Sequence, residues 1–351
     1  MKKIQTTLIA IAFLMLAQMA CPIWTLAAES TETAATEAAS AETSAAEAAS
    51  TDASETEASA IESETETEEV VLRGLVKTKK GKYRFYKKDG TMLTSSWKTI
   101  NGYRYYFKAN GNAAVGGYKI GNYIYVFKAN GRLAKKSSAG RVTVNGDTYY
   151  VDKKGRATTS SWLIINNKLC YAAKNGKLKK NTTFKNITFN SNGYAESGTE
   201  ANLKLLTMKI VSQITTDGMT QAQKLRACWS YVTNRSRWYY YGSYPSNFAS
   251  GWQKAMAYRF LSGGGGNCYA FACAFAALAC EVGYDAYVVC GRVSGSRDGA
   301  SDGLTRHAWV RINGCYYDPE AQFAGWWTGC YGVGSYGIRH TISAIYRFST
   351  Y

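Results

Sequence analysis

The chain has 351 residues, 42 Lys and Arg against 25 Asp and Glu, and a formal net charge of +17, a length sufficient for two or three domains. With only two histidines, His307 and His340, a zinc site would need mainly thiolate ligands, and the spacing of the nine cysteines predicts none. We find no motif for nucleic-acid binding and none that predicts a cofactor.

The N-terminus reads MKKIQTTLIAIAFLMLAQMA, two lysines followed by an apolar run and then small residues. This pattern predicts a secretory signal over residues 1–27, cleaved near Ala27. The alternative is a retained membrane anchor, but the run is short for crossing a bilayer, so we expect no stable membrane insertion after cleavage. Residues 28–69 are almost entirely Ala, Glu, Ser and Thr, which predicts a disordered linker.

Positive charge is concentrated in residues 70–199, which hold 26 of the 42 bases and only 4 of the acids. A field of this sign attracts anionic partners. For an exported chain, the expected partner is a wall polymer or another negatively charged surface. A basic face that serves only solubility is the alternative.

Residues 70–199 repeat a short pattern of alternating aromatic and polar residues followed by a turn. The copies align on glycines spaced 17 to 24 residues apart: Gly90, Gly111, Gly131, Gly155, Gly176 and, more weakly, Gly193. This period predicts an array of β-hairpins, each a strand leading into a tight turn. Since one hairpin cannot bury its own apolar face, neighbouring hairpins are expected to stack.

This region resembles the cell-wall-binding repeats of choline-binding and glucan-binding proteins, in aromatic triplets such as Tyr105, Tyr106 and Phe107. The resemblance implies binding of a wall ligand through aromatic side chains, for which Trp97, Tyr105, Tyr106 and Trp162 are the candidates. Only Trp97 and Trp162 occupy the tryptophan position of the repeat. We therefore expect attachment to a wall polymer through stacking and charge rather than complete choline cages, with an inert spacer as the alternative.

Residues 200–351 change to a mixed helical and extended pattern. Helical spacing is present in 201–214, in 220–241 with Thr220 as a possible cap, and in 252–266. Residues 268–282 predict a helix that is apolar on nearly every face and closed by Gly283. Cys268 stands at the head of that helix, where the helix dipole and free backbone N–H groups are expected to lower the thiol pKa.

Two strands, HAWVRI and YYD, flank Asn313-Gly314, a strong signal for a two-residue hairpin turn. In that register Ile312 faces Cys315, and His307 lies diagonal to Asp318 on the same face. An imidazole held by a carboxylate beside Cys268 would form a nucleophile, base and orienter. The alternative is a core histidine bonded to a carboxylate, and His340 is the only rival base.

The motifs GNCYAFA, HAWV and YYDPE, in this order, resemble the transglutaminase-like superfamily, the papain-like Cys-His-Asp group. The resemblance implies an α+β domain in which Cys268 is the nucleophile, His307 the general base and acid, and Asp318 the orienting carboxylate. It also implies reaction through a thioester, with the acyl group passed to water or to an amine. No glutamine stands just before Cys268 to complete an oxyanion hole, so its backbone N–H is the expected donor, with Gln253 or Trp252 as alternatives.

The sequence therefore predicts a secreted, cell-wall-associated thiol enzyme that acts on amide bonds of a peptide or protein, most readily as a peptidase or amidase. Protein crosslinking of the transglutaminase type and a non-catalytic surface protein are the alternatives. Export permits disulfides, and Cys315 with Cys330 is one candidate pair.

Overall fold

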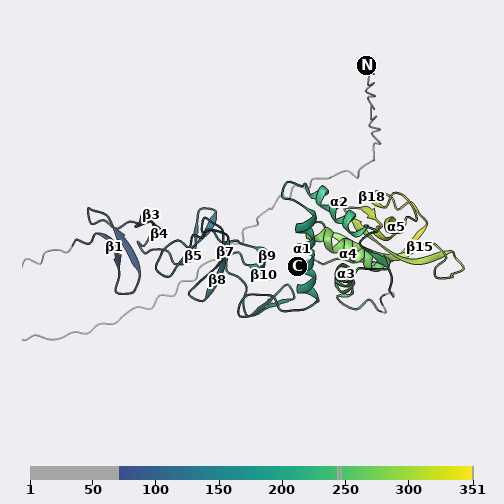
Figure 1. The fold of residues 1–351 in the computed structure, drawn as a ribbon, viewed down its shortest axis with the longest axis horizontal. Coiled ribbons are helices and arrows are strands. Elements are labelled where there is room, and N and C mark those ends of the chain that lie inside the picture. Colours follow the sequence, from purple (N-terminus) through teal and green to yellow (C-terminus); the bar gives the residue numbers. More distant parts are fainter. Residues whose placement is uncertain (1–70, 243–244, 246, 350–351) are drawn as a thin grey trace, which may run out of the picture.

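The computed structural model describes residues 71–242, 245 and 247–349. The predicted signal (1–27) and linker (28–69) lie outside the described residues. Within them, a row of β-hairpins leads into a mixed α/β domain, which gives the molecule an elongated shape (Figure 1). The predicted order, hairpin array first and α+β domain second, is confirmed.

The array consists of two-stranded antiparallel hairpins, and the weak sixth copy is one of them. The hairpins are β1 (Gly74–Lys77) with β2 (Tyr83–Tyr86), β3 (Ser96–Ile100) with β4 (Tyr103–Phe107), β5 (Gly116–Ile120) with β6 (Tyr123–Phe127), β7 (Gly140–Val144) with β8 (Asp147–Val151), β9 (Ser161–Ile165) with β10 (Lys168–Ala172), and β11 (Thr182–Phe184) with β12 (Ile187–Phe189).

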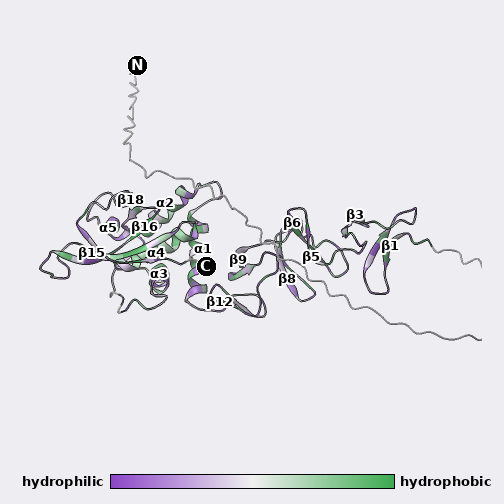
Figure 2. Cartoon of the chain, turned by 180° about the vertical axis from the view of Figure 1, so that it is seen from behind, coloured by the Kyte–Doolittle hydropathy of each residue, from purple (hydrophilic) through white to green (hydrophobic). Residues whose placement is uncertain are grey.

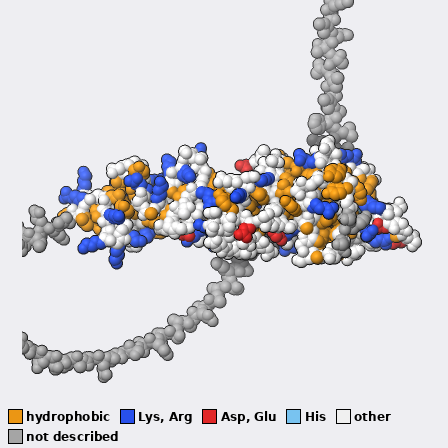
Figure 3. All heavy atoms as spheres, turned by 60° about the horizontal axis from the view of Figure 1, so that its bottom comes forward, with side chains coloured by type: hydrophobic (Ala, Val, Ile, Leu, Met, Phe, Trp, Pro, Cys, Tyr) orange, Lys and Arg blue, Asp and Glu red, His pale blue; other side chains and the backbone are white. Residues whose placement is uncertain are grey.

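Successive hairpins are joined by backbone hydrogen bonds from the turn that follows each one. Leu133 N–H donates to the Arg104 carbonyl at 2.8 Å, and Ala157 N–H donates to the Ile124 carbonyl at 2.7 Å. The repeated glycine of each turn lies close to the preceding hairpin. At Gly131, for example, an added Cβ atom would lie only 2.9 Å from the Cβ atom of Ala113. Stacking therefore buries what a single hairpin leaves exposed, and Lys and Arg side chains are spread among hydrophobic ones over the face of the array seen in Figure 3.

The C-terminal domain packs helices against one antiparallel sheet of order β18-β17-β16-β15-β19. Its helices are α1 (Thr199–Ile214), α2 (Gln221–Val232), α3 (Trp252–Gly263), α4 (Cys268–Glu281) and α5 (Pro319–Ala324). Its strands are β13 (Tyr239–Tyr240), β14 (Gly265–Gly266), β15 (Ala286–Ser294), β16 (Leu304–Ile312), β17 (Cys315–Tyr317), β18 (Tyr331–Val333) and β19 (His340–Arg347).

Helix α4 is the centre of this domain, lying between the sheet and helices α1–α3 (Figure 1). Its residues from Cys268 to Cys280 are all buried, as the all-round apolar pattern predicts. In Figure 2 the helix is largely green, the colour of hydrophobic residues. Gly283, with φ of 92°, ends the helix as expected. No helix in the described part of the chain is long and apolar enough to cross a membrane.

One expectation differs from the structure, and one open alternative is decided. The second helical stretch ends at Val232 instead of continuing to residue 241, because the Asn234 side chain accepts the Ser236 N–H at 2.9 Å and turns the chain. Cys330 is a free thiol, so the Cys315–Cys330 disulfide is not formed. The Thr220 cap is confirmed, as part of a capping box with Gln223.

The glycine run before Cys268 has a steric reason. Strand β14 pairs in parallel with β13, Tyr239 opposite Gly265 and Tyr240 opposite Gly266. A Cβ at Gly265 would lie 2.0 Å from the Tyr239 carbonyl oxygen, and Gly265 has a φ of 140°. The chain therefore reaches the head of α4 along a path that only glycine can follow.

We predict that Gly265→Ala destabilises the protein by at least about 2 kcal/mol, because the methyl group must displace backbone. Gly263→Ala is the matched control, since a Cβ there meets nothing within 4 Å. It should change stability by less than about 0.5 kcal/mol. Urea unfolding measures both, and equal effects would contradict the steric explanation.

Candidate active site

Cys268 is the first residue of α4 and has no exposed surface. The Asn267 side chain caps the helix by accepting the Ala270 N–H at 3.4 Å. The sulfur therefore lies among the N–H groups that the first helical turn leaves without intrahelical partners. Such groups can stabilise a negative charge that develops on a bound carbonyl oxygen.

His307 and Asp318 are brought together by the β16–β17 hairpin. The turn is at Asn313-Gly314, and Ile312 pairs with Cys315, so the predicted register is confirmed. His307 Nε2 lies 2.7 Å from Asp318 Oδ2, and both side chains are fully buried.

Asp318 is itself fixed from two further directions. Its Oδ1 accepts the Ala321 N–H at 3.0 Å, and its Oδ2 accepts the Tyr336 hydroxyl at 2.5 Å. Trp309 stacks on Tyr336 with ring centroids 4.8 Å apart. The carboxylate therefore holds the imidazole in one orientation and leaves Nδ1 free to face other groups.

Glu320 is a fully buried member of the site that sequence reasoning missed. Its Oε2 lies 3.2 Å from His307 Nδ1, and ligand atoms of Cys268, His307 and Glu320 lie within 4.8 Å of one another. The sequence Asp318-Pro319 does signal the start of α5, since Asp318 caps the helix and Pro319 follows it, but this signal does not show that residue 320 is buried.

Burial and charge set the proton affinities of this cluster. Burial raises the pKa of the Cys268 thiol above its ordinary value of 9.0, even though the His307 imidazole acts to lower it. The expectation of a lowered thiol pKa is thus wrong for this closed arrangement, because dehydration of the sulfur outweighs the helix N-terminus. For His307, burial alone would lower the pKa, but Asp318, Cys268 and Glu320 together raise it well above 6.5.

Three other residues considered from the sequence have partners of their own. The Gln253 side chain donates to the carbonyls of Tyr346 and Arg347, each at 3.4 Å, and Trp252 packs on Tyr346. The Gln253 amide is therefore already engaged away from Cys268. His340 donates its Nδ1–H to the Ile338 carbonyl, 2.8 Å away, and remains a weaker candidate base than His307.

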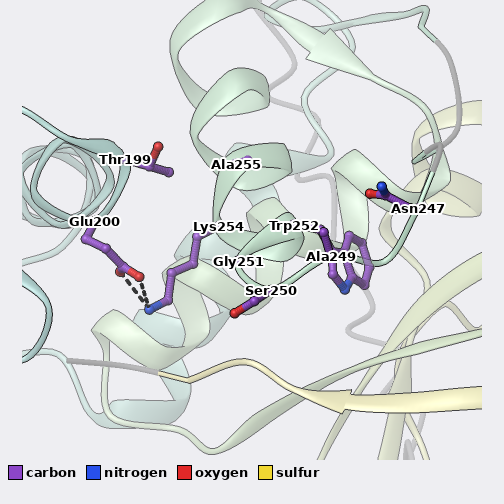
Figure 4. A pocket seen from close by; sticks show the side chains of 9 residues that line it. All are labelled: Thr199, Glu200, Asn247, Ala249, Ser250, Gly251, Trp252, Lys254 and Ala255. Carbon is purple, nitrogen blue, oxygen red and sulfur yellow. Dashed lines mark hydrogen bonds and ion pairs between the residues drawn. The ribbon is translucent and has the colours of Figure 1, made fainter.

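A pocket at the start of α3 is also separate from the cluster. It is lined by Thr199, Glu200, Asn247, Ala249, Ser250, Gly251, Trp252, Lys254 and Ala255 (Figure 4). Lys254 and Glu200 form an ion pair at 2.6 Å across it. None of Cys268, His307 or Asp318 lines it, so the pocket offers no direct route to the thiol.

The aromatic candidates of the repeats differ in accessibility. Trp97, Tyr106 and Trp162 are partly buried, whereas Tyr105 lies in the core with 3% of its surface exposed. The Trp97 ring carries the Arg104 guanidinium 4.1 Å from its centroid. The same arrangement recurs on two exposed tyrosines, with Arg132 3.6 Å from Tyr103 and Arg156 4.6 Å from Tyr123.

These observations define an α/β domain with a buried cysteine, histidine and acid cluster at the head of its central helix. Residues 208–327 match the model of the transglutaminase-like superfamily, and this part of the chain is a transglutaminase-like core domain. No curated protein matches the chain.

The hairpin region is similar to repeats in several solved structures. CbpF in complex with ipratropium is 29% identical, covering 36% of this chain and 39% of that one, with a TM-score of 0.26. Choline binding protein F from Streptococcus pneumoniae is 24% identical, covering 36% and 48%, with a TM-score of 0.22. The modular autolysin LytC of the same organism, in complex with synthetic peptidoglycan ligand, is 19% identical, covering 35% and 28%, with a TM-score of 0.26. The chain thus spans less than half of each.

We predict that the stabilising effect of Asp318 depends on pH. Because the folded protein holds the His307 pKa above its unfolded value, this stabilisation is fully present below about pH 6.5 and is lost as pH rises through the folded pKa. Asp318→Asn should therefore lower the free energy of unfolding more at about pH 6 than at about pH 9.

Urea unfolding at both pH values measures the difference. Asp285→Asn, which removes a carboxylate paired with the always-charged Arg347 at the surface, is the control and should show no such trend. A loss for Asp318→Asn that is equal at both pH values, or larger at high pH, would contradict the role assigned to His307.

Proposed function

We propose that the protein is a secreted, cell-wall-associated thiol enzyme that cleaves amide bonds of peptides or proteins. Residues 200–351 form its catalytic domain and residues 70–199 attach it to the wall. The observation that carries the catalytic proposal is the fully buried His307–Asp318 pair, 2.7 Å apart, beside a cysteine at a helix N-terminus.

The reaction uses Cys268 as nucleophile. His307 Nδ1 takes the thiol proton, the sulfur attacks the amide carbon, and the backbone N–H of Cys268 receives the developing oxyanion. The imidazolium then gives its proton to the leaving amine, which leaves a thioester on Cys268. Water, deprotonated by the same imidazole, attacks the thioester and releases the acid. Asp318 keeps the ring in place throughout.

Access to the thiol requires movement of the residues around it. The centroid of the Trp326 ring lies 6.1 Å from that of the His307 ring. The Arg297 guanidinium contacts both Trp326, 5.1 Å from its ring centroid, and the Tyr240 hydroxyl, to which it donates at 2.9 Å. Trp326 and Tyr240 are 45% and 47% exposed, so they can meet an incoming chain. We therefore assign these three residues to the substrate approach.

Wall attachment is supported by the arginines that cover the aromatic rings of the repeats. Choline binds such rings through its trimethylammonium group, but here Arg104, Arg132 and Arg156 already occupy that position. The repeats thus present guanidinium groups, which pair with phosphate or carboxylate. The proposed ligand is accordingly an anionic wall polymer.

We predict that the purified full chain releases new amino groups from peptidoglycan stem peptides or from a protein substrate. Cys268→Ala and His307→Ala should each lower the rate at least about 10³-fold, since each removes a member of one catalytic unit. Cys280→Ala, which deletes a thiol from the other end of the same helix, should keep the wild-type rate.

A labelled primary amine added to a glutamine-containing substrate separates hydrolysis from crosslinking. We expect the label to enter slowly relative to hydrolysis, whereas preferential incorporation would assign the protein to the transglutaminase type. If the wild-type protein releases amino groups no faster than Cys268→Ala on every substrate, the catalytic proposal is wrong. The protein would then be a non-catalytic surface protein.

We predict that the full chain binds a purified wall fraction in a salt-dependent manner and that excess choline does not displace it. Arg104→Ala and Arg132→Ala should each weaken binding by roughly 0.5–1 kcal/mol, measured by co-sedimentation. Lys224→Ala, a base of the C-terminal domain, is the control and should have no effect. Release by choline would contradict the proposal.

A further inference from the structure

We propose that Cys268, His307 and Glu320 bind a single divalent transition-metal ion, Zn²⁺ in the first instance, and that the bound ion blocks the nucleophile. The donors would be Sγ of Cys268, Nδ1 of His307 and a carboxylate oxygen of Glu320. All three side chains are fully buried, and their donor atoms lie within 4.8 Å of one another.

The donor set suits Zn²⁺. Thiolate, imidazole and carboxylate are the ligands that this ion takes in proteins, at about 2.0–2.3 Å, in tetrahedral sites that often leave one position for water. Those bond lengths place neighbouring donors roughly 3.4–3.7 Å apart. His307 Nδ1 and Glu320 Oε2 are already 3.2 Å apart, and since no two of the three donors are more than 4.8 Å apart, relative shifts of about an ångström complete the site.

The surroundings already supply the outer shell of such a site. A histidine that binds metal usually donates its other ring N–H to a carboxylate, which fixes the ring. His307 Nε2 has this partner in Asp318 at 2.7 Å, and Asp318 is held by the Ala321 N–H and the Tyr336 hydroxyl. Nδ1 is thereby left pointing at Cys268 and Glu320.

The pairing of Glu320 leaves it able to accept a further positive partner. Among the described residues, its buried Oε1 has no hydrogen bond, and its Oε2 lies 3.2 Å from His307 Nδ1 as an ion pair without hydrogen-bond geometry. A buried carboxylate without a donor is costly unless it is protonated or binds a cation. The triad chemistry assigns no role to Glu320, whereas metal binding uses its charge.

Binding converts the thiol to a thiolate held by the ion, and its proton passes to solvent. A sulfur bonded to the metal cannot attack an amide carbon, so the loaded form is inactive as a thiol enzyme. This inference concerns binding alone and does not depend on turnover, because the three ligands bind metal whether or not the protein cleaves amides.

The test uses the full chain, freed of metal by a chelator, and titrates it with Co²⁺, whose bond to thiolate absorbs in the near ultraviolet. We expect saturation at one ion per chain, release of protons, and displacement of Co²⁺ by Zn²⁺. Cys268→Ser should lose the absorption, and Glu320→Gln should weaken binding at least about tenfold. Cys280→Ala is the matched control and should behave as wild type.

A second measurement needs no variant. Zn²⁺ should protect Cys268 from alkylation in the wild-type chain, as identified by mass spectrometry, and a chelator should restore the reaction. Absence of saturable binding, no protection of Cys268, or undiminished binding in folded Glu320→Gln would each overturn the proposal. Loss of amide cleavage with binding intact would instead refute only the proposed function.

Discussion

The contact between His307 Nε2 and Asp318 Oδ2, 2.7 Å long and closed to solvent, is the interaction on which the site depends. It exists because the Asn313-Gly314 turn sets the register of β16 against β17, and a shift of one residue would turn His307 to the other face of the sheet. With the ring fixed at Nε2, only Nδ1 remains to face α4. The position of that helix then determines whether the cysteine meets the imidazole, and its uniformly apolar surface places it against this sheet.

The hairpin array is governed by a different constraint, the small core of each unit. A hairpin such as β5–β6 buries only Val126 and Phe127 fully, so its stability must come from its neighbours. The regular hydrogen bonds from turn to preceding hairpin supply the alignment. Because stacking uses one side of the aromatic residues, the other side faces solvent, where arginines of the following repeat cover it. The basic surface and the stacking are therefore consequences of one arrangement.

Features of the fold that depend on a local sequence pattern could be predicted from the sequence. The repeat period predicts the hairpins, the Asn-Gly pair predicts the register that joins His307 to Asp318, and the apolar run predicts the buried helix with Cys268 at its head. Glu320 was missed because its burial depends on how α5 turns away from β17, a tertiary feature without hydrophobic periodicity. The direction of the Cys268 pKa was wrong for a related reason: a helix N-terminus can be read from sequence, whereas complete enclosure of the sulfur cannot.

The charge balance of the cluster connects these features. The carboxyl groups of Asp318 and Glu320 already lie with the His307 imidazole in a region closed to water, and a thiolate would add a further negative charge there. Burial of unbalanced charge is strongly unfavourable, so the closed arrangement keeps the Cys268 thiol protonated. In the proposed amide chemistry the thiolate forms once substrate enters past Trp326, and in the proposed metal site it forms when a cation binds at Glu320. The same carboxylate that raises the pKa of the Cys268 thiol in the closed state would thus favour the ion.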